Sequence, residues 1–306
     1  GAAIAGIGDL NGDGYADAAV GAPGWTNGPS AVGRVDLLAG SSLAAIPLTP
    51  IASLEGDAAT DRLGYGAEVD ALGDVNGDGY ADVFVSREAA AVPPQDYAEI
   101  VYGGPAGAGF RQIFGGCGLS LARATSIDTD ADGFPEVHVG EPNSGPTCGA
   151  ATPPGQVERF VGHGEGLDAA GAFTWGPLSE GGPGEFFGQS LGAVDFNGDG
   201  YDDLVVGAPS AGTNGGGQAW VYFGSPGGVD PQPDVLLQGA LVSAGDDYGQ
   251  AVAGVGDVDG DGFEDVIVGA PGLAGPAGAD AGQAFLFLGA ASPAPTLPPA
   301  GSALQG

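Results

Sequence analysis

The sequence predicts an all-β protein built from five repeated four-stranded units. A nine-residue pattern at residues 9–17 returns at 74–82, 128–136, 195–203 and 257–265. Each copy leads into a short apolar run rich in β-branched residues, such as residues 203–206, and runs of this kind are typical of strands. Gly and Pro recur at matching places in each repeat, which indicates ordered turns rather than disorder.

The repeat period of 54 to 67 residues fits four antiparallel strands with generous loops. In the fourth repeat we expect strands at 189–194, 204–206, 218–223 and 235–238, and in the fifth at 250–255, 266–268, 283–288 and 303–305. The first strands contain small residues, which allow strands to pack closely around a central axis. The third strands contain large aromatic residues such as Trp220 and Phe285. Second strands are nearly continuous in apolar residues, as expected of strands covered on both faces.

Four-stranded sheets repeated around an axis form a β-propeller. We therefore expect residues 1–306 to form one β-propeller domain of five four-stranded antiparallel blades, at approximately 1–63, 64–116, 117–185, 186–246 and 247–306. The alternative is that these blades are part of a six- or seven-bladed ring. Gly1 precedes Asp9 by the same eight residues that separate Gly249 from Asp257, so we expect five whole blades with no strand exchanged between the ends.

The nine-residue loops predict calcium sites. Each has oxygen-bearing side chains at positions 1, 3, 5 and 9, Gly at position 6 and Tyr or Phe at position 7. Calcium takes six to eight oxygens, and a loop supplies them at alternate positions only if it turns sharply, which Gly permits. Position 12 is Val in every copy, where a helix-loop-helix calcium site has Glu, so the loop is expected to join two strands. Magnesium is less suited because it requires strict octahedral geometry and keeps most of its waters.

Five bound Ca²⁺ ions are expected, each held by side chains at positions 1, 3, 5 and 9 and by the backbone carbonyl of position 7. The expected ligands are Asp9, Asn11, Asp13, Tyr15, Asp17, Asp74, Asn76, Asp78, Tyr80, Asp82, Asp128, Asp130, Asp132, Phe134, Glu136, Asp195, Asn197, Asp199, Tyr201, Asp203, Asp257, Asp259, Asp261, Phe263 and Asp265. The third site should differ from the others, because Pro135 precedes the longer Glu136 there. The alternative is a hairpin turn in which Asp and Asn side chains cap their own backbone.

The net charge of −33 excludes nucleic acid as a partner, since the six basic residues form no surface that could displace counterions from phosphates. No apolar run reaches the eighteen residues of a membrane span. Filling many loops of modest affinity requires millimolar calcium, which is an extracellular condition. We therefore expect a secreted or cell-surface protein, and a disulfide between Cys117 and Cys148.

Short motifs on both sides of the fourth loop resemble the FG-GAP repeat of the integrin α-subunit propeller. Phe187-Gly188 precedes the first strand and Gly207-Ala208-Pro209 follows the second. Residues 21–23 and 269–271 repeat the second motif, and residues 65–66 and 248–249 vary the first to Tyr-Gly. The resemblance covers the whole chain and implies calcium-bound blades in an extracellular recognition protein, which we take to be a bacterial integrin-like protein.

The chain also departs from that family. Integrin α propellers have seven blades with calcium in only some of them, whereas the five loops here all have ligand-type residues. Residues 86–88 and 140–142 differ from Gly-Ala-Pro, and no inserted adhesion domain or Arg-Gly-Asp tripeptide is present. The ligand therefore does not follow from the resemblance.

An enzyme is not expected. His138 is expected within the second strand of the third blade and His163 in the turn after its third strand, so each is interpreted as a core or surface histidine and not as a catalytic one. The Gly-rich residues 213–217 lack the strand-then-helix setting of a phosphate cradle. Three non-catalytic functions stay open: a protein-binding adhesion module, a lectin that stacks sugars on Trp25, Trp175 or Tyr97, and a spacer domain of a larger surface protein.

Any protein or glycan ligand is expected on the rim opposite the calcium loops, where the variable loops open. These loops are residues 24–31, 57–63, 87–96, 143–154, 180–185, 210–216 and 272–281, with Trp25, Asn27, Arg62, Arg87, Asp96 and Tyr97 as candidate contacts. The protein is expected to be a monomer.

Overall fold

The computed structural model contains only β-strands in the part of the chain that it describes. The described residues are 3–27, 30–42, 50–56, 68–87, 96–109, 111–116, 123–142, 155–175, 185–212, 214–238, 243–274, 282–291 and 303–305. Within these residues there are five four-stranded antiparallel sheets and one two-stranded hairpin. No helix in this part of the chain is long and apolar enough to cross a bilayer.

Each four-stranded sheet is formed by strands that follow one another in the chain. Sheet 1 contains β1 (Ala3–Gly8), β2 (Asp17–Ala22), β5 (Arg34–Leu38) and β6 (Ala52–Glu55), with the hairpin β3 (Thr26–Asn27) and β4 (Ser30–Ala31) between β2 and β5. Sheet 2 contains β7 (Val69–Gly73), β8 (Asp82–Arg87), β9 (Asp96–Val101) and β10 (Arg111–Gly116). Sheet 3 contains β11 (Arg123–Ile127), β12 (Glu136–Glu141), β13 (Gln156–His163) and β14 (Gly166–Trp175).

Sheets 4 and 5 follow the strand positions expected from the sequence. Sheet 4 contains β15 (Ser190–Val194), β16 (Asp203–Ala208), β17 (Gln218–Tyr222) and β18 (Val235–Leu237). Sheet 5 contains β19 (Ala251–Gly256), β20 (Asp265–Ala270), β21 (Gln283–Phe287) and β22 (Ala303–Gln305). In both sheets the loop of nine residues separates the first two strands.

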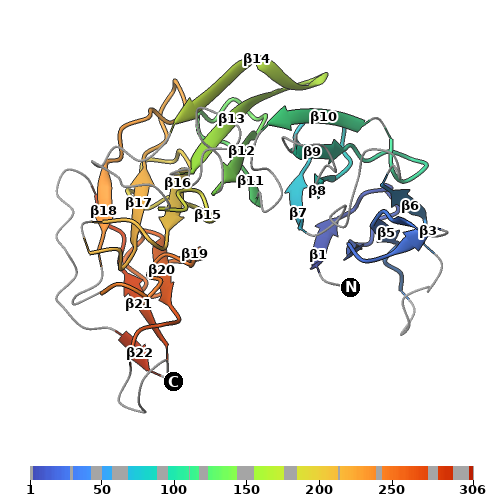
Figure 1. Ribbon diagram of the computed structural model, residues 1–306. Helices are drawn as coiled ribbons and strands as arrows, with labels where there is room; N and C mark the ends of the chain where they lie inside the picture. Colours follow the sequence, from blue (N-terminus) through green and yellow to red (C-terminus); the bar gives the residue numbers. More distant parts are fainter. Residues whose placement is uncertain are drawn as a thin grey trace.

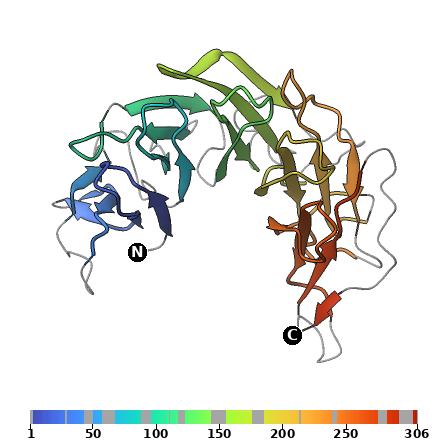
Figure 2. The same cartoon turned by 180° about the vertical axis from the view of Figure 1, so that it is seen from behind.

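The five sheets are arranged side by side around a common centre, with the first strand of each sheet on the inside (Figure 1). Contacts between these inner strands join β1 to β7, β7 to β11, β11 to β15 and β15 to β19. The arrangement confirms the prediction of a β-propeller of five four-stranded blades. The blades form an open arc, and the two chain ends lie on opposite sides of its opening (Figures 1 and 2).

Hydrophobic residues form one cluster at each junction between neighbouring blades. The second strands β8 and β16 take part in two clusters each, because successive side chains of a strand point to opposite faces. In β16, which is buried throughout, Leu204 and Val206 pack against blade 3 while Val205 packs toward blade 5. This two-sided burial explains why the second strands are continuously apolar.

The Phe-Gly and Gly-Ala-Pro motifs of neighbouring blades meet at each junction that the structure describes in full. Tyr248 of blade 5 is buried and forms a parallel bridge with Gly217 of blade 4. Gly207 lies so close to the carbonyl oxygen of Gly249 that a side chain at Gly207 would clash with it. Gly140 and Gly188 make the same approach between blades 3 and 4. Glycine is therefore needed at this position because two backbones touch.

We expect Gly207→Ala to destabilise the protein by about 1–3 kcal/mol, the usual cost of forcing an extra methyl group into a packed interior. The matched control is Gly269→Ala, since the nearest atoms to a side chain at Gly269 are 3.7 and 3.8 Å away, on Ala251 of the same sheet. Denaturant unfolding of both variants in calcium measures the difference. Equal losses of stability in the two variants would show that the contact between blades is not the cause.

Candidate metal loops

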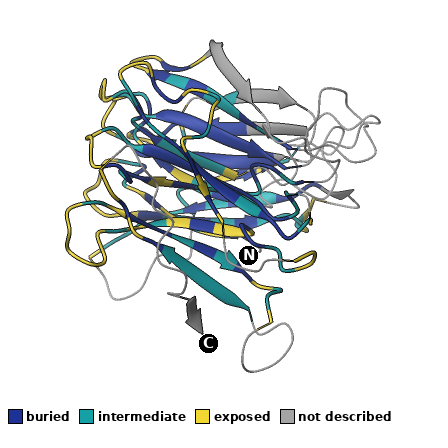
Figure 3. Ribbon diagram, turned by 90° about the vertical axis from the view of Figure 1, so that its left-hand side faces the viewer, coloured by how far each residue is buried: buried dark blue, intermediate teal, exposed yellow. Residues whose placement is uncertain are grey.

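The five loops connect the first two strands of each blade, and so they lie on one rim of the arc. Loops 1 and 2, and loops 4 and 5, are joined by a backbone hydrogen bond from the N–H of position 8 to the carbonyl of position 1 in the preceding loop, whereas position 8 of the third loop is Pro135, which has no N–H. Ala81 donates to Asp9 at 3.0 Å, and Glu264 donates to Asp195 at 3.2 Å. Seen from the side, exposed turns gather along one edge of the sheets (Figure 3). The loops therefore lie along that edge, with direct backbone bonds between loops 1 and 2 and between loops 4 and 5.

Each loop is held by hydrogen bonds from its backbone N–H groups to its own acidic and amide side chains. In the fourth loop, Asp195 accepts from Asp199 N and Gly200 N, both at 3.1 Å. Asn197 Oδ1 accepts from Asp199 N at 2.9 Å, and Asp199 Oδ1 accepts from Tyr201 N at 3.0 Å. The other four loops repeat this pattern. The side chains at positions 1, 3 and 5 thus face the inside of the loop.

Two residues of each loop have left-handed backbone conformations. In the fourth loop these are Gly198 at position 4, with φ of 71°, and Gly200 at position 6, with φ of 87°. The need for Gly at position 6 was expected from the sequence, but the role of position 4 was not. Position 4 is Gly in every loop except the third, where Ala131 has φ of 58°. The repeated Gly at position 4 could have indicated from the sequence that this position needs a left-handed backbone.

Position 4 is also where the next blade packs. Side chains added to Gly12, Gly77 and Gly198 would lie 2.5–2.7 Å from the ring of the position 7 residue of the following loop. The rings belong to Tyr80, Phe134 and Phe263. The aromatic residue at position 7 therefore has two roles. Its backbone carbonyl is an expected calcium ligand, and its side chain covers the preceding loop.

The carboxylate at position 9 is buried, and each of its two oxygens accepts one backbone hydrogen bond. We call this arrangement the clasp. Asp203 Oδ2 accepts from Phe196 N at 2.9 Å, and its Oδ1 accepts from Gly224 N at 2.8 Å. Asp17, Asp82 and Asp265 make the equivalent pairs of bonds. Each of these carboxylates links position 2 of its loop to a residue just after the third strand of the same blade. The residue at position 9 therefore stabilises the fold whether or not a metal is bound.

The glycine that completes this clasp was missed in the sequence. Gly40, Gly103, Gly224 and Gly289 each follow a third strand, 21 to 24 residues after position 9. A side chain at Gly224 would clash with the carbonyl oxygen of Asp202, and the other three are equally confined. The regular distance from position 9 could have revealed them.

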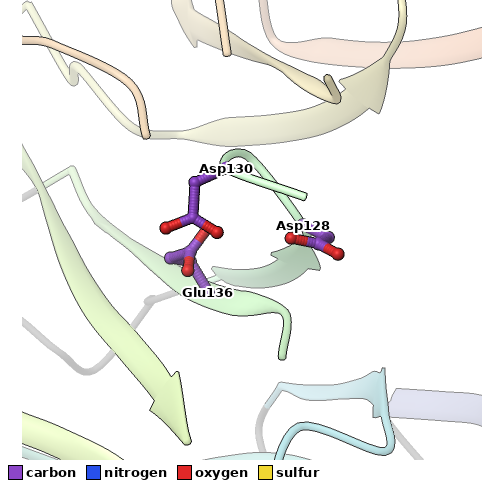
Figure 4. Close-up of side chains that lie close together, drawn as sticks. All are labelled: Asp128, Asp130 and Glu136. Carbon is purple, nitrogen blue, oxygen red and sulfur yellow. The ribbon is translucent and has the colours of Figure 1, made fainter. Parts of the chain in front are cut away.

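Carboxylates come together in the third and fifth loops, where positions 1, 3 and 9 are all acidic. One oxygen from each of Asp128, Asp130 and Glu136 lies within 4.8 Å of the others, and the fifth loop has the same arrangement. Figure 4 shows Asp130 and Glu136 side by side, with Asp128 facing them. Oxygens gathered in this way suit a hard cation such as calcium.

Burial and neighbouring charges make the ionised form of some of these groups costly. Burial raises the pKa of Asp82 to about 7, although backbone hydrogen bonds from Gly103 and Val75 favour ionisation, and the carboxylates of Asp78 and Asp74 raise it further. The pKa of Asp203 is raised to about 7 for the same reasons. A bound cation would offset this cost by compensating the charge.

The third loop differs from the others at position 9. Glu136 Oε2 accepts from both the N–H, at 3.0 Å, and the hydroxyl of Thr129. Glu136 Oε1 is buried and accepts no hydrogen bond from the described residues. The longer side chain thus does not form the two-ended clasp of the aspartates, and it leaves one oxygen for another partner.

The remaining residues singled out in the sequence have varied positions. His138 is buried in β12, where burial lowers its pKa to about 3, with Arg159 contributing, so it is neutral at pH 7. His163 ends β13 instead of lying in the turn as expected; its side chain is exposed and accepts from Glu165 N at 3.2 Å. Trp25 is half-buried, and the Arg34 guanidinium lies over its ring at 5.4 Å, so one ring face is already covered.

Several candidates can be placed only through the backbone or not at all. Arg87 and Tyr97 are cross-strand partners on β8 and β9. Asp96 begins β9 and Trp175 ends β14. Arg62 and the expected disulfide between Cys117 and Cys148 lie outside the described residues.

Comparison with known proteins agrees with the motifs. Residues 1–38, 187–222 and 248–287 match the FG-GAP repeat. The chain is 40% identical over 92 residues to integrin alpha-3 of Mus musculus, 46% identical over 87 residues to integrin alpha pat-2 of Caenorhabditis briggsae, and 41% identical over 101 residues to integrin alpha-PS5 of Drosophila melanogaster. These stretches are 29%, 28% and 31% of this chain but only 8%, 7% and 10% of those relatives.

The chain therefore contains FG-GAP repeats and is similar to integrin α-subunits in sequence. These relatives are animal proteins, and a bacterial source stays a prediction. Among solved structures, a variant of AofleA from Arthrobotrys oligospora aligns over 94% of this chain and 86% of its own, with 12% identity and a TM-score of 0.26. That likeness is too low to support an argument about fold or function.

We expect Asp203→Ala to destabilise the protein even in chelator, because two buried N–H groups lose their acceptor at about 1–3 kcal/mol each. Asp199→Ala removes an exposed loop carboxylate and should cost less than about 1 kcal/mol in chelator. Urea unfolding of both variants in EDTA tests this. Equal stability of the two variants in EDTA would contradict the stabilising role that we assign to the two hydrogen bonds of Asp203.

Proposed function

We propose that the chain is a calcium-binding, non-catalytic ligand-recognition module of an extracellular adhesion protein, in which its five sheets are blades of one propeller domain. The observation that carries the proposal is the fivefold repetition of one loop geometry, with inward-facing oxygens at positions 1, 3 and 5 beside a buried carboxylate at position 9. A capped turn alone would not require this concentration of negative charge.

The residues named in the sequence analysis would hold the ions, one in each loop. Calcium would supply positive charge inside the loops and thereby fix the rim. Its role is structural in this proposal, because each loop also packs against the next blade through positions 4 and 7. An ion that fixes one loop therefore also supports the junction between two blades.

Recognition rather than catalysis is supported by the state of the histidines and by the similarity to integrin α-subunits. His138 is buried and neutral, and His163 is exposed at the end of β13, so neither is placed as a general base. The similarity to integrins favours a protein ligand and a secreted or cell-surface location. Because Arg34 covers one face of Trp25, that ring is poorly suited to stack a sugar there.

We place the ligand on the rim opposite the calcium loops. On that rim the hairpin of β3 and β4 projects between β2 and β5, and Thr26 and Asn27 are exposed. The calcium rim has its backbone committed to loop hydrogen bonds and to contacts with the next blade. The opposite rim is free of that constraint and can vary without loss of the fold.

Removal of calcium should lower the melting temperature strongly. If ambient calcium is about a hundred times the Kd, each ion contributes roughly 2.7 kcal/mol of stability. Isothermal titration calorimetry should find five calcium ions per chain, and Asp199→Ala should reduce that number to four. A melting temperature that is the same in calcium and in EDTA would overturn the proposal, and magnesium is the control ion.

Ligand binding should depend on the rim opposite the loops. After a binder has been found on arrays of extracellular proteins and glycans, we expect replacement of Trp25, Arg87 and Tyr97 together by Ala to weaken it at least about tenfold, or 1.4 kcal/mol. Asp199→Ala should change binding only as far as it lowers the melting temperature. If instead the triple variant binds normally and Asp199→Ala abolishes binding at unchanged stability, the ligand occupies the calcium rim.

A further inference from the structure

Three of the five loops have an Asn-Gly pair at positions 3 and 4. The pairs are Asn11-Gly12, Asn76-Gly77 and Asn197-Gly198. An Asn that precedes Gly is open to deamidation, because Gly has no side chain that would keep its backbone nitrogen away from the Asn side chain. That nitrogen attacks Cγ of the Asn, the Cγ–Nδ2 bond breaks, and ammonia leaves with the proton of the attacking N–H. Water then opens the resulting succinimide ring and yields either Asp or isoaspartate.

The folded loops hold both polar atoms of these Asn side chains. Asn76 Oδ1 accepts from Asp78 N at 3.2 Å, and its Nδ2 donates to Asp78 Oδ2 at 3.1 Å. Asn197 makes the same two bonds to Asp199, both at 2.9 Å. Reaction at Cγ requires the side chain to turn toward the nitrogen of position 4 and to release Nδ2. These bonds to position 5 therefore oppose the reaction for as long as the loop is ordered.

In the first loop the attacking nitrogen is held as well. Asn11 makes the same pair of bonds to Asp13, and Gly12 N donates to Asp9 Oδ1 at 2.7 Å. All the polar atoms that take part in the reaction thus have partners within the folded loop.

The aromatic ring at position 7 of the following loop covers each Asn-Gly pair. A Cβ atom built on Gly198 would lie 2.6 Å from the ring of Phe263, and Gly12 and Gly77 are covered in the same way. Asn197 itself is only 7% exposed. A succinimide ring includes the nitrogen of position 4 and the Asn side chain, so its formation needs space that the neighbouring blade fills.

Position 3 fits one product of the reaction and not the other. Loops 3 and 5 already have Asp130 and Asp259 at this position, and each accepts from the N–H of position 5 as the Asn residues do. Isoaspartate instead passes the main chain through its Cβ atom, which adds one carbon between positions 3 and 4. The oxygens at positions 1, 3 and 5 then lose the spacing that lets them face the inside of one loop.

We propose that Asn11, Asn76 and Asn197 are deamidation sites that the ordered loops keep closed and that react when a loop opens. Reaction follows local opening, because the bonds to position 5 and the neighbouring ring protect each pair separately. In one respect this rests on the proposed function, since bound calcium would fix the loops and slow the reaction further. A loop that has lost its calcium is then converted in part to isoaspartate and does not regain its site when calcium returns.

The rate of ammonia loss at each Asn-Gly pair tests the proposal. The protein is kept at mildly alkaline pH in calcium, in EDTA and in urea, and peptide mass spectrometry follows each Asn separately. We expect the three loop residues to react at least about tenfold more slowly in calcium than in urea, and faster in EDTA than in calcium, because opening must precede reaction. Asn27 also precedes Gly but is exposed in the β3–β4 hairpin, so its rate should change less between the three conditions.

Equal rates in calcium and in urea at all three loop residues would overturn the proposal. Rates that are slow and equal in calcium and in EDTA would support protection by the fold, and would count against bound calcium and hence against the proposed function. The two proposals therefore fail in different ways.

Phe263→Ala isolates the part played by the ring. In calcium this variant should deamidate at least about fivefold faster at Asn197, with no change at Asn76, because only the cover of Gly198 is lost. The matched control is Tyr201→Ala, which removes the position 7 ring of the fourth loop; the loop before it has no Asn-Gly pair. Equal rates at Asn197 in the two variants, or equal acceleration at Asn76 and Asn197 in Phe263→Ala, would contradict protection by the neighbouring ring.

Discussion

Close contact between neighbouring blades is the constraint on which the rest of this structure depends. A four-stranded sheet has two faces, and here blades 2, 3 and 4 bury both of them against the blades before and after, so the hydrophobic core consists of junctions. At the described junctions the backbones themselves touch, as at Gly207 and Gly249. Many of the glycines are therefore needed for close packing between blades as well as for turns.

The loops that we propose bind calcium belong to the same system of contacts. Position 7 illustrates this, because its backbone N–H bonds to position 5 of its own loop while its ring covers position 4 of the preceding loop. In loops 2 and 5, position 8 adds a backbone bond to position 1 of the preceding loop. Neighbouring loops thus contact one another directly, through a ring at Gly12, Gly77 and Gly198 and through backbone bonds between loops 1 and 2 and loops 4 and 5.

Charge and fold are linked through position 9. A carboxylate such as Asp203 is buried because two backbone N–H groups need an acceptor, yet burial beside other acids raises its pKa to about 7. The fold thus places acidic groups where they are costly unless their charge is compensated. In the proposed function, calcium compensates that charge, which explains how a chain of net charge −33 can hold its acids together.

The sequence alone determined the class of fold and the pattern of the loops, because both depend on local chemistry that repeats. The alternation of loops and apolar strands, the left-handed Gly at position 6 and the two-sided burial of strands such as β16 were all predictable. The reasons for Gly at position 4 and after the third strand were not, since both are set by atoms of other segments.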